Sequence, residues 1–145
     1  MTEFFVPGVP VPKGSAKAFM RKGMRFPVVI QDNADKQKPW ASMIGYAAQQ
    51  AGAQLIQSDS VDLRLTFYMP RPKSHLRKDG TLRPSAPATH TTKPDLDKLI
   101  RCCKDALKGV CYVDDSQVNT VHAHKTYQEQ HSENRTGAWI RLQAC

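Results

Sequence analysis

Two short acidic motifs are the residues of this chain whose types and spacing could do chemistry. Asp95 and Asp97 flank a leucine directly after Pro94, and Asp114 and Asp115 follow about one helix length later. At a helix start the first carboxylate of such a pair has non-helical geometry and can converge with the second. Clustered carboxylate oxygens suit Mg²⁺, which can activate a water and stabilise charge on a phosphate. If the two motifs meet, they could therefore hydrolyse a phosphodiester.

The same acids also have an ordinary structural interpretation. Asp95 can cap the helix that begins there, and Asp97 can stabilise the positive end of the helix dipole. Arg101 lies four residues after Asp97 on the same helical face. It could contact a scissile phosphate, or it could form a surface ion pair with Asp97. Spacing alone leaves both interpretations open.

The segment between the motifs supplies the scaffold that would position them. Its apolar residues fall on one helical stripe, which predicts an amphipathic helix over residues 95–108 that ends near Gly109. The second motif then opens a turn before the next extended segment. Such a turn can bring the chain back beside the next strand, and if it also meets the helix start, three carboxylates converge.

The other periodic segments predict a sheet on which this helix can pack. Residues 61–69 alternate apolar and polar side chains without a break, which predicts a strand with one buried face. Residues 34–51 carry apolar side chains at helical spacing and predict another helix. Extended patterns predict an edge strand over residues 4–11, a hairpin over 19–30, and two antiparallel strands over 118–127 and 138–142.

The predicted order is strand, hairpin, helix, strand, helix, strand, strand. This order favours an α/β fold of the α+β type, with a mixed sheet and two packed helices. A chain of 145 residues can bury one core, so we expect a single domain over residues 1–145. The hairpin turn would carry Arg21, Lys22 and Arg25, which could meet a phosphate backbone or remain solvated.

The charge balance favours a polyanionic partner. Twenty-one Lys and Arg stand against thirteen Asp and Glu, which gives a net charge of +8. Nucleic acid is the first partner to consider, and a basic soluble protein without such a partner is the plain alternative. No apolar run approaches the roughly 18 residues that span a bilayer, and the N-terminus lacks the order of a signal peptide. We therefore expect a cytoplasmic protein with no membrane partner.

Four cysteines form no CxxC pair and no pattern typical of a secreted disulfide framework. We expect reduced thiols. A zinc site drawn from Cys111, His122 and His124 is a weak alternative, because these residues lack ligand pairs at finger-like spacing.

Residues 70–94 contain five prolines, six basic residues and one acid, with no usable periodicity. A stretch of this length inside a compact domain is usually functional or disordered. Because it leads directly into the first acidic motif, we interpret it as a flexible basic arm that binds DNA; the alternative is a disordered connector. The candidate DNA-binding residues are Arg71, Lys73, Arg77, Lys78, Arg83 and Lys93 of the arm, together with Lys98 of the helix.

Residues 93–118, KPDLDKLIRCCKDALKGVCYVDDSQV, resemble the signature region of RusA-type crossover junction endodeoxyribonucleases. In that family a D-x-D helix is followed by a D-D-x-Q turn. The likeness joins both acidic motifs, the apolar pattern between them, the D-A-L at residues 105–107 and Gln117. Outside this region it is looser, chiefly the order of elements and the basic arm.

The resemblance implies an intertwined homodimer that binds four-way DNA junctions and cuts two strands symmetrically with Mg²⁺, in recombination and repair. It also implies that Asp95, Asp97 and Asp115 bind the metal, which leaves Asp114 as the less favoured ligand. Members of the family carry a catalytically important lysine where this chain has Arg101, and commonly an asparagine where it has Lys98. Arginine can hold a phosphate, but its high pKa makes it a poor proton-transfer group.

Two other functions remain compatible with the sequence. A metal-dependent nuclease that acts on flaps or other branched DNA would use the same acids. A non-catalytic basic DNA-binding protein would use the acids as caps and would show salt-sensitive binding without metal-dependent cutting. A sugar-nucleotide transferase, suggested by D-x-D alone, would need a nucleotide-binding domain for which the chain has neither room nor motif.

Overall fold

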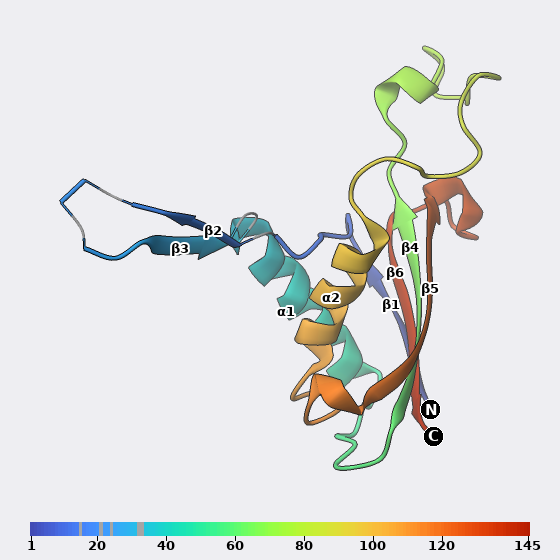
Figure 1. Ribbon diagram of the computed structural model, residues 1–145. Helices are drawn as coiled ribbons and strands as arrows, with labels where there is room; N and C mark the ends of the chain where they lie inside the picture. The colour runs from blue at the N-terminus through green and yellow to red at the C-terminus, as the bar shows by residue number, and fades with distance from the viewer. Residues whose placement is uncertain (15, 21, 24, 32–33) are drawn as a thin grey trace.

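The structure is a computed structural model that describes residues 1–14, 16–20, 22–23, 25–31 and 34–145. Two helices, α1 (Ala34–Gln50) and α2 (Leu96–Leu107), cover one face of a four-stranded mixed sheet (Figure 1). The strands of this sheet, in spatial order, are β1 (Thr2–Pro7), β6 (Gly137–Ala144), β4 (Val61–Met69) and β5 (Val118–Tyr127). A separate hairpin consists of β2 (Ala16–Phe19) and β3 (Val28–Gln31). The predicted α+β fold with a mixed sheet and two packed helices is confirmed.

The last two strands of the chain do not pair with each other, although they are consecutive in the sequence. The strands β5 and β6 run antiparallel to each other as predicted, but β4 lies between them, parallel to β5 and antiparallel to β6. The central position suits β4 because six of its nine residues are buried. Two more, Asp62 and Tyr68, are partly buried. A strand of this kind is more stable when both of its edges are paired. 

The N-terminal strand lies at the edge of the sheet, as its prolines predicted. It pairs antiparallel with β6 from Thr2 to Pro7, which is earlier than the expected range of residues 4–11. The pairing ends there because Pro7 and Pro10 have no N–H to donate and Gly8 adopts a φ of 126°. The chain beyond Gly8 is therefore free to leave the sheet and cross toward α2.

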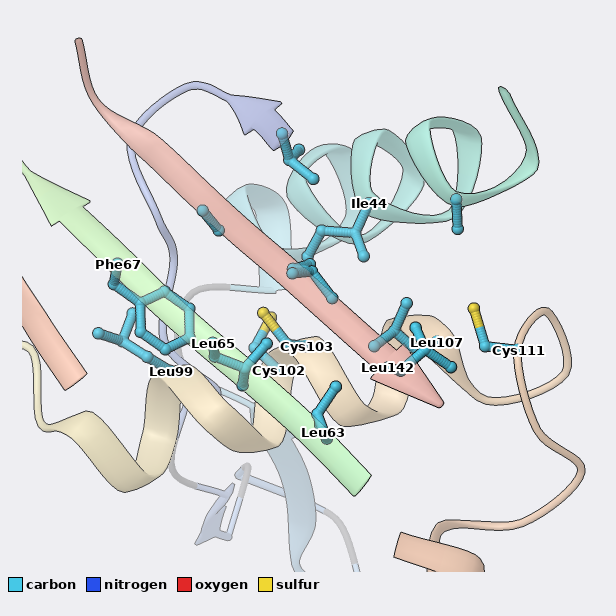
Figure 2. Close-up of a cluster of buried hydrophobic side chains, with 14 of the residues drawn as sticks. Ile44, Leu63, Leu65, Phe67, Leu99, Cys102, Cys103, Leu107, Cys111 and Leu142 are labelled. Atoms are coloured by element: carbon cyan, nitrogen blue, oxygen red, sulfur yellow. The ribbon is translucent and has the colours of Figure 1, made fainter. Parts of the chain in front are cut away.

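The core lies between the sheet and the two helices (Figure 2). Alternate residues of β4, namely Leu63, Leu65 and Phe67, meet Ile44 of α1 and Leu99 of α2, and all five are at most 1% exposed. The regular alternation of β4 and the apolar stripe of α2 therefore face each other as predicted. Neither helix, within the described residues, is long and apolar enough to cross a bilayer.

The cysteines are free thiols, and three of them belong to this core. Burial raises the pKa of Cys102 and of Cys111 to about 11, so neither is a thiolate at neutral pH. The histidines of the alternative zinc site, His122 and His124, are exposed on β5. No group of three His, Cys, Asp or Glu residues that could hold a metal is present in the described part of the chain. The structure thus does not assemble a zinc site.

Residues 70–94 are more ordered than their composition suggested. They contain a 3₁₀ turn at Lys73–His75 and an isolated bridge between Leu76 and Leu82, closed by a turn at Gly80. The Asp79 carboxylate accepts hydrogen bonds from the backbone and hydroxyl of Thr81 within that turn. The arm is therefore a loop with local structure of its own above the end of β4 (Figure 1), and its flexibility and DNA binding stay predictions.

The predicted hairpin is present, but its strand β2 ends at Phe19, where the prediction began. The hairpin projects away from the sheet and helices (Figure 1). Of the three basic residues predicted at its turn, Lys22 and Arg25 are exposed. Arg21 lies outside the described residues.

Candidate active site

Asp95 is the N-cap residue of α2, but its side chain does not cap the helix. The residue has extended geometry, with φ −69° and ψ 141°, and its carboxylate makes no cap hydrogen bond. Asp97 lies in the first turn, and both side chains are exposed. Asp95 therefore does not cap the helix as the structural interpretation of the sequence expected. Its two carboxylate oxygens can bind another partner.

The chain entering α2 is held by a residue of the neighbouring strand. Lys125 of β5 donates hydrogen bonds from Nζ to the carbonyl oxygens of Thr92, at 2.6 Å, and of Pro94, at 2.8 Å. Both carbonyl groups belong to the short segment that leads into Asp95. Sequence reasoning did not find Lys125, because its partners are backbone carbonyls some thirty positions away and leave no signal in its own neighbourhood.

The second acidic motif forms a tight 3₁₀ turn, Asp115–Gln117. Asp114 is its N-cap and accepts a hydrogen bond from the N–H of Ser116, which is also the main reason that the pKa of Asp114 is lowered. Gln117 Oε1 accepts from the N–H groups of Val113 and Asp114, each at 2.8 Å. Asp114 and Gln117 therefore hold the turn together.

The amide of Gln117 also ties this turn to the loop before β4. Its Nε2 donates to the carbonyl oxygens of Ile56, at 3.0 Å, and Asp59, at 3.1 Å. The turn is thus fixed on two sides, which fixes the backbone of Asp115 as well.

Asp115 itself has an unsatisfied carboxylate oxygen. Its Oδ1 is buried and has no hydrogen-bond partner in the described part of the chain. A buried anionic oxygen without a partner is costly, and a bound cation is one way in which proteins remove that cost. The observation fits Asp115 as a metal ligand and separates it from Asp114, whose carboxylate is already used.

The two acidic motifs lie at opposite ends of α2 (Figure 1). A helix of 12 residues is about 18 Å long at ~1.5 Å per residue. Within the described residues no three acids come together to form a metal site. The convergence that the sequence left open is therefore not seen within the described part of one chain, because the turn after α2 leads into β5 at the far end of the helix. It is Lys125, near the end of β5, that returns to the helix start.

A cleft of about 810 Å³ opens beside Asp95. It lies between the segment before the hairpin, the start of α1, the end of β4 and the start of α2, and Asp95 is the one acid that lines it among the described residues. Four lysines line it as well: Lys13, Lys36, Lys93 and Lys98. Sequence reasoning missed Lys13 and Lys36, because only the fold brings the N-terminal half of the chain to the acidic motif.

The sequence matches the family model described as Endodeoxyribonuclease RusA over residues 7–136. The chain belongs to the RusA endodeoxyribonuclease family. The match covers the arm, both acidic motifs and the two strands β4 and β5, and so confirms the resemblance carried by residues 93–118. The chain is also similar to a protein of Bacillus subtilis (strain 168), the "Uncharacterized protein YqaN". The two are 33% identical over 136 residues, which cover 88% of this chain and 89% of that protein.

In this RusA-family chain, the residue at the position of the family lysine is an exposed arginine. Arg101 lies on α2, and the described part of the chain contains no ion pair between it and Asp97. The surface-pair interpretation of their spacing is therefore not realised in the structure. The guanidinium remains available to an incoming phosphate.

The predicted DNA-binding residues of this RusA-family chain differ in their exposure. Five of them are exposed on the loop and before α2: Lys73, Arg77, Lys78, Arg83 and Lys93. Lys98 is half-buried on α2 and lines the cleft. Arg71 differs from all of these, since only 6% of its side chain is exposed.

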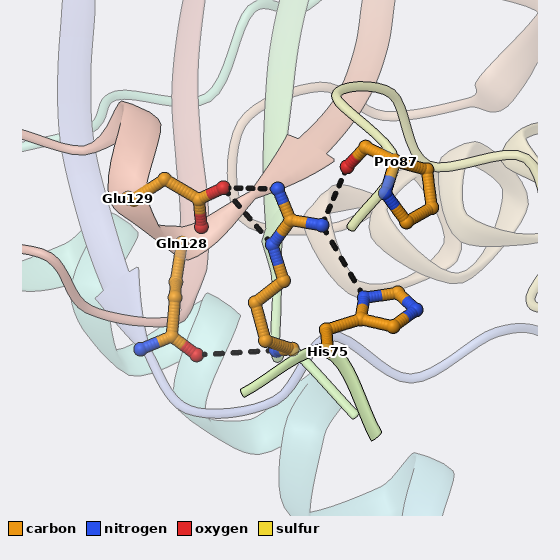
Figure 3. A network of polar contacts seen from close by, with 5 residues as sticks. His75, Pro87, Gln128 and Glu129 are labelled. Atoms are coloured by element: carbon orange, nitrogen blue, oxygen red, sulfur yellow. Dashed lines mark hydrogen bonds and ion pairs between the residues drawn. The ribbon is translucent and has the colours of Figure 1, made fainter. Parts of the chain in front are cut away.

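Arg71 anchors the arm to the end of the sheet, and Figure 3 labels its hydrogen-bond partners His75, Pro87, Gln128 and Glu129. Its guanidinium pairs with Glu129, donates to the carbonyl oxygen of Pro87 at 2.6 Å, and lies 3.6 Å from the centre of the Tyr127 ring. A further contact joins it to His75 Nδ1 at 3.3 Å. The charge of Arg71 is thus engaged by contacts within the protein, which disfavours the predicted contact with a DNA backbone.

Proposed function

We propose that the chain is a magnesium-dependent endonuclease that resolves four-way DNA junctions by paired, symmetric cuts. The observation that carries the proposal is the buried Oδ1 of Asp115, which has no partner among the described residues. Its position in the D-D-x-Q turn of a RusA-family chain supports a metal ligand at that point. Asp95 and Asp97 would complete the ligand set.

The metal, when bound, would supply an activated water and stabilise charge at the scissile phosphate. Arg101 would bind that phosphate from the exposed face of α2, as a permanent cation. Lys125 would hold the backbone before Asp95 and so fix where its carboxylate lies. The exposed basic residues of the arm would bind the DNA backbone, consistent with the net charge of +8.

The separation of the motifs favours a homodimer. Asp95 and Asp97 lie at one end of α2 and Asp115 lies beyond the other, so one chain holds two halves of a site. In a two-fold dimer the Asp115 of one copy could meet Asp95 and Asp97 of the other, and each copy would contribute to both sites. The projecting hairpin gives the two copies a means to intertwine (Figure 1).

The first experiment compares cleavage of a labelled four-way junction, a flap and a linear duplex, with and without Mg²⁺. Paired symmetric nicks in the junction that require Mg²⁺ are expected. Asp97→Asn and Asp115→Asn should each abolish cutting and leave junction binding intact. Equal cutting of all three substrates would instead indicate a nuclease without junction preference. Binding without any metal-dependent cutting would indicate a non-catalytic DNA-binding protein.

A mixing experiment tests the shared site. Neither Asp97→Asn nor Asp115→Asn should cut as a homodimer. If the acids join across the dimer, a heterodimer of the two variants keeps one complete site and nicks one strand. If each copy builds its own site, both sites of that heterodimer are damaged, and the absence of nicking would refute the shared arrangement.

A further inference from the structure

The cleft beside Asp95 has the dimensions of a site for one small ligand. Its volume of about 810 Å³ falls within the ~300–1,000 Å³ range of clefts that bind small molecules. Asp95 stands in its lining. A group bound there would therefore lie next to a carboxylate of the proposed catalytic site.

Part of the lining is apolar. Residues 9–12, with the sequence Val-Pro-Val-Pro, contribute to it, and so do Met69 and Pro94. These side chains form no hydrogen bonds, so they favour contact with a flat apolar surface over contact with water. Val9 is 53% exposed, which leaves much of its side chain available to a ligand.

The cleft also contains a flat and neutral ring. His90 lines it and packs at 5.0 Å, centre to centre, on the ring of Tyr127. Burial lowers the pKa of His90, and the charges of Lys125 and Arg71 lower it further, so the imidazole is uncharged at neutral pH. A nucleobase can pack on such a surface.

The charged residues of the cleft complement a phosphate. Lys36 at the start of α1 and Lys93 before α2 are both exposed and both line it. Apolar walls together with lysines match the two parts of a nucleotide, the base and its phosphate.

We propose that this cleft receives one unstacked nucleotide of the strand that is cut, adjacent to the scissile phosphate. The inference rests on the proposed endonuclease function and adds a nucleotide site to it. A base inside a linear duplex is stacked on both sides and cannot enter, whereas stacking is interrupted at the crossover of a junction. Unstacking costs least where pairing and stacking are already disturbed, so the cleft contributes to the preference for junctions.

The test places 2-aminopurine, whose fluorescence rises when it is unstacked, on either side of the mapped cut position. Junctions carrying it are bound by the Asp97→Asn protein, which keeps the DNA intact. Val9→Trp, made in the same background, fills the cleft. Leu55→Trp is the matched control, because Leu55 is 40% exposed and does not line the cleft.

Lys36→Ala and Lys38→Ala form a second pair of variants on α1. Of these two lysines, Lys36 alone lines the cleft.

The fluorescence should rise on binding at one of the two positions, and Val9→Trp should suppress that rise while Leu55→Trp does not. In the active protein, Val9→Trp and Lys36→Ala should slow single-turnover cutting about tenfold or more, because a small displacement of the substrate is enough to do so. Fluorescence that stays unchanged on binding, or that Val9→Trp leaves intact, would overturn the nucleotide site even if the wild type cuts junctions. Failure of the wild type to cut any DNA would overturn the proposed function itself.

Discussion

Lys125 Nζ lies 2.8 Å from the carbonyl oxygen of Pro94, so the last residue but two of β5 holds the peptide that leads into Asp95. The same amine binds the carbonyl oxygen of Thr92. A single side chain from the sheet therefore fixes the start of α2, where two of the proposed metal ligands lie. Its charge is directed at backbone oxygens, which identifies it as a positioning residue for Asp95.

Replacing this lysine should damage cutting more than binding. Lys125→Met removes both hydrogen bonds and leaves the chain before Asp95 without its anchor, so we expect single-turnover cutting to fall about 100-fold, as for a misplacement of about 1 Å. Junction affinity, measured by gel shift, should change little. Lys38→Met, an exposed lysine of α1, is the control. Equal loss of affinity and cutting in Lys125→Met would show that the lysine binds DNA directly.

The role of Arg101 can be separated from that of a general base. Arg101→Met removes the cation and should slow cutting about 100-fold, the usual cost of losing one group that stabilises charge in the transition state. Arg101→Lys keeps the charge and should retain most of the activity. Arg135→Met, which alters an exposed arginine before β6, is the control. If Arg101→Met cut junctions at the wild-type rate, a role at the phosphate would be refuted.

The Arg71–Glu129 pair should make the stability of the protein depend on pH, with a loss at low pH. The hydrogen bond from Arg71 is the main reason that the pKa of Glu129 lies below its ordinary value of 4.5. A carboxylate whose pKa is lowered by folding stabilises the folded state above its ordinary pKa, and this contribution is lost as the pH falls through the lowered value.

Glu129→Gln should therefore reduce the free energy of unfolding by about 1–3 kcal/mol at pH 7, the cost of a lost charged hydrogen bond. The difference in free energy of unfolding between Glu129→Gln and the wild type should shrink as the pH falls below the ordinary pKa of Glu129. Urea denaturation at pH 7 and near pH 3 measures both. Glu133→Gln, at an exposed acid with a looser ion pair, is the control. A difference that stayed constant with pH would contradict the assignment.

Gly137 is the residue of the sheet that least tolerates a side chain. Its φ is 157°, and an added Cβ would lie 2.4 Å from the carbonyl oxygen of Val6 on the paired strand β1. Gly52 also has a positive φ, of 79°, but nothing lies within 4 Å of an added Cβ there.

Gly52→Ala thus measures only the cost of a positive φ for a residue with a side chain, about 1–2 kcal/mol. Gly137→Ala adds a clash between the new Cβ and the carbonyl oxygen of Val6. We expect Gly137→Ala to lower the free energy of unfolding by clearly more than Gly52→Ala in urea titrations. Similar losses in the two variants would show that β1 moves away at little cost.

The local elements of this chain could be predicted from the sequence because they depend on short-range patterns. The unbroken alternation of β4 and the apolar stripe of α2 each define one buried face, and the structure confirms both. The acidic motifs and Gln117 were also sufficient to indicate the family, since they lie within one short segment.

The placement of the acids was decided by the tertiary structure. Sequence spacing allowed the D-D-x-Q turn to return to the helix start, but β5 begins at the far end of α2, so Asp115 lies away from Asp95 in one chain. Burial likewise places the Arg71 guanidinium in contact with Glu129 and Pro87, although its type and its position in a basic arm predicted a phosphate contact.

What the sequence determined by itself is therefore the set of elements, the charge and the family, because these follow from periodicity, composition and one contiguous motif. What only the tertiary structure decided is which distant residues share a surface. Lys125, Lys36 and the Val-Pro-Val-Pro segment meet near Asp95 because strand order and helix packing bring them there. Such contacts depend on long-range packing, and no local pattern encodes them.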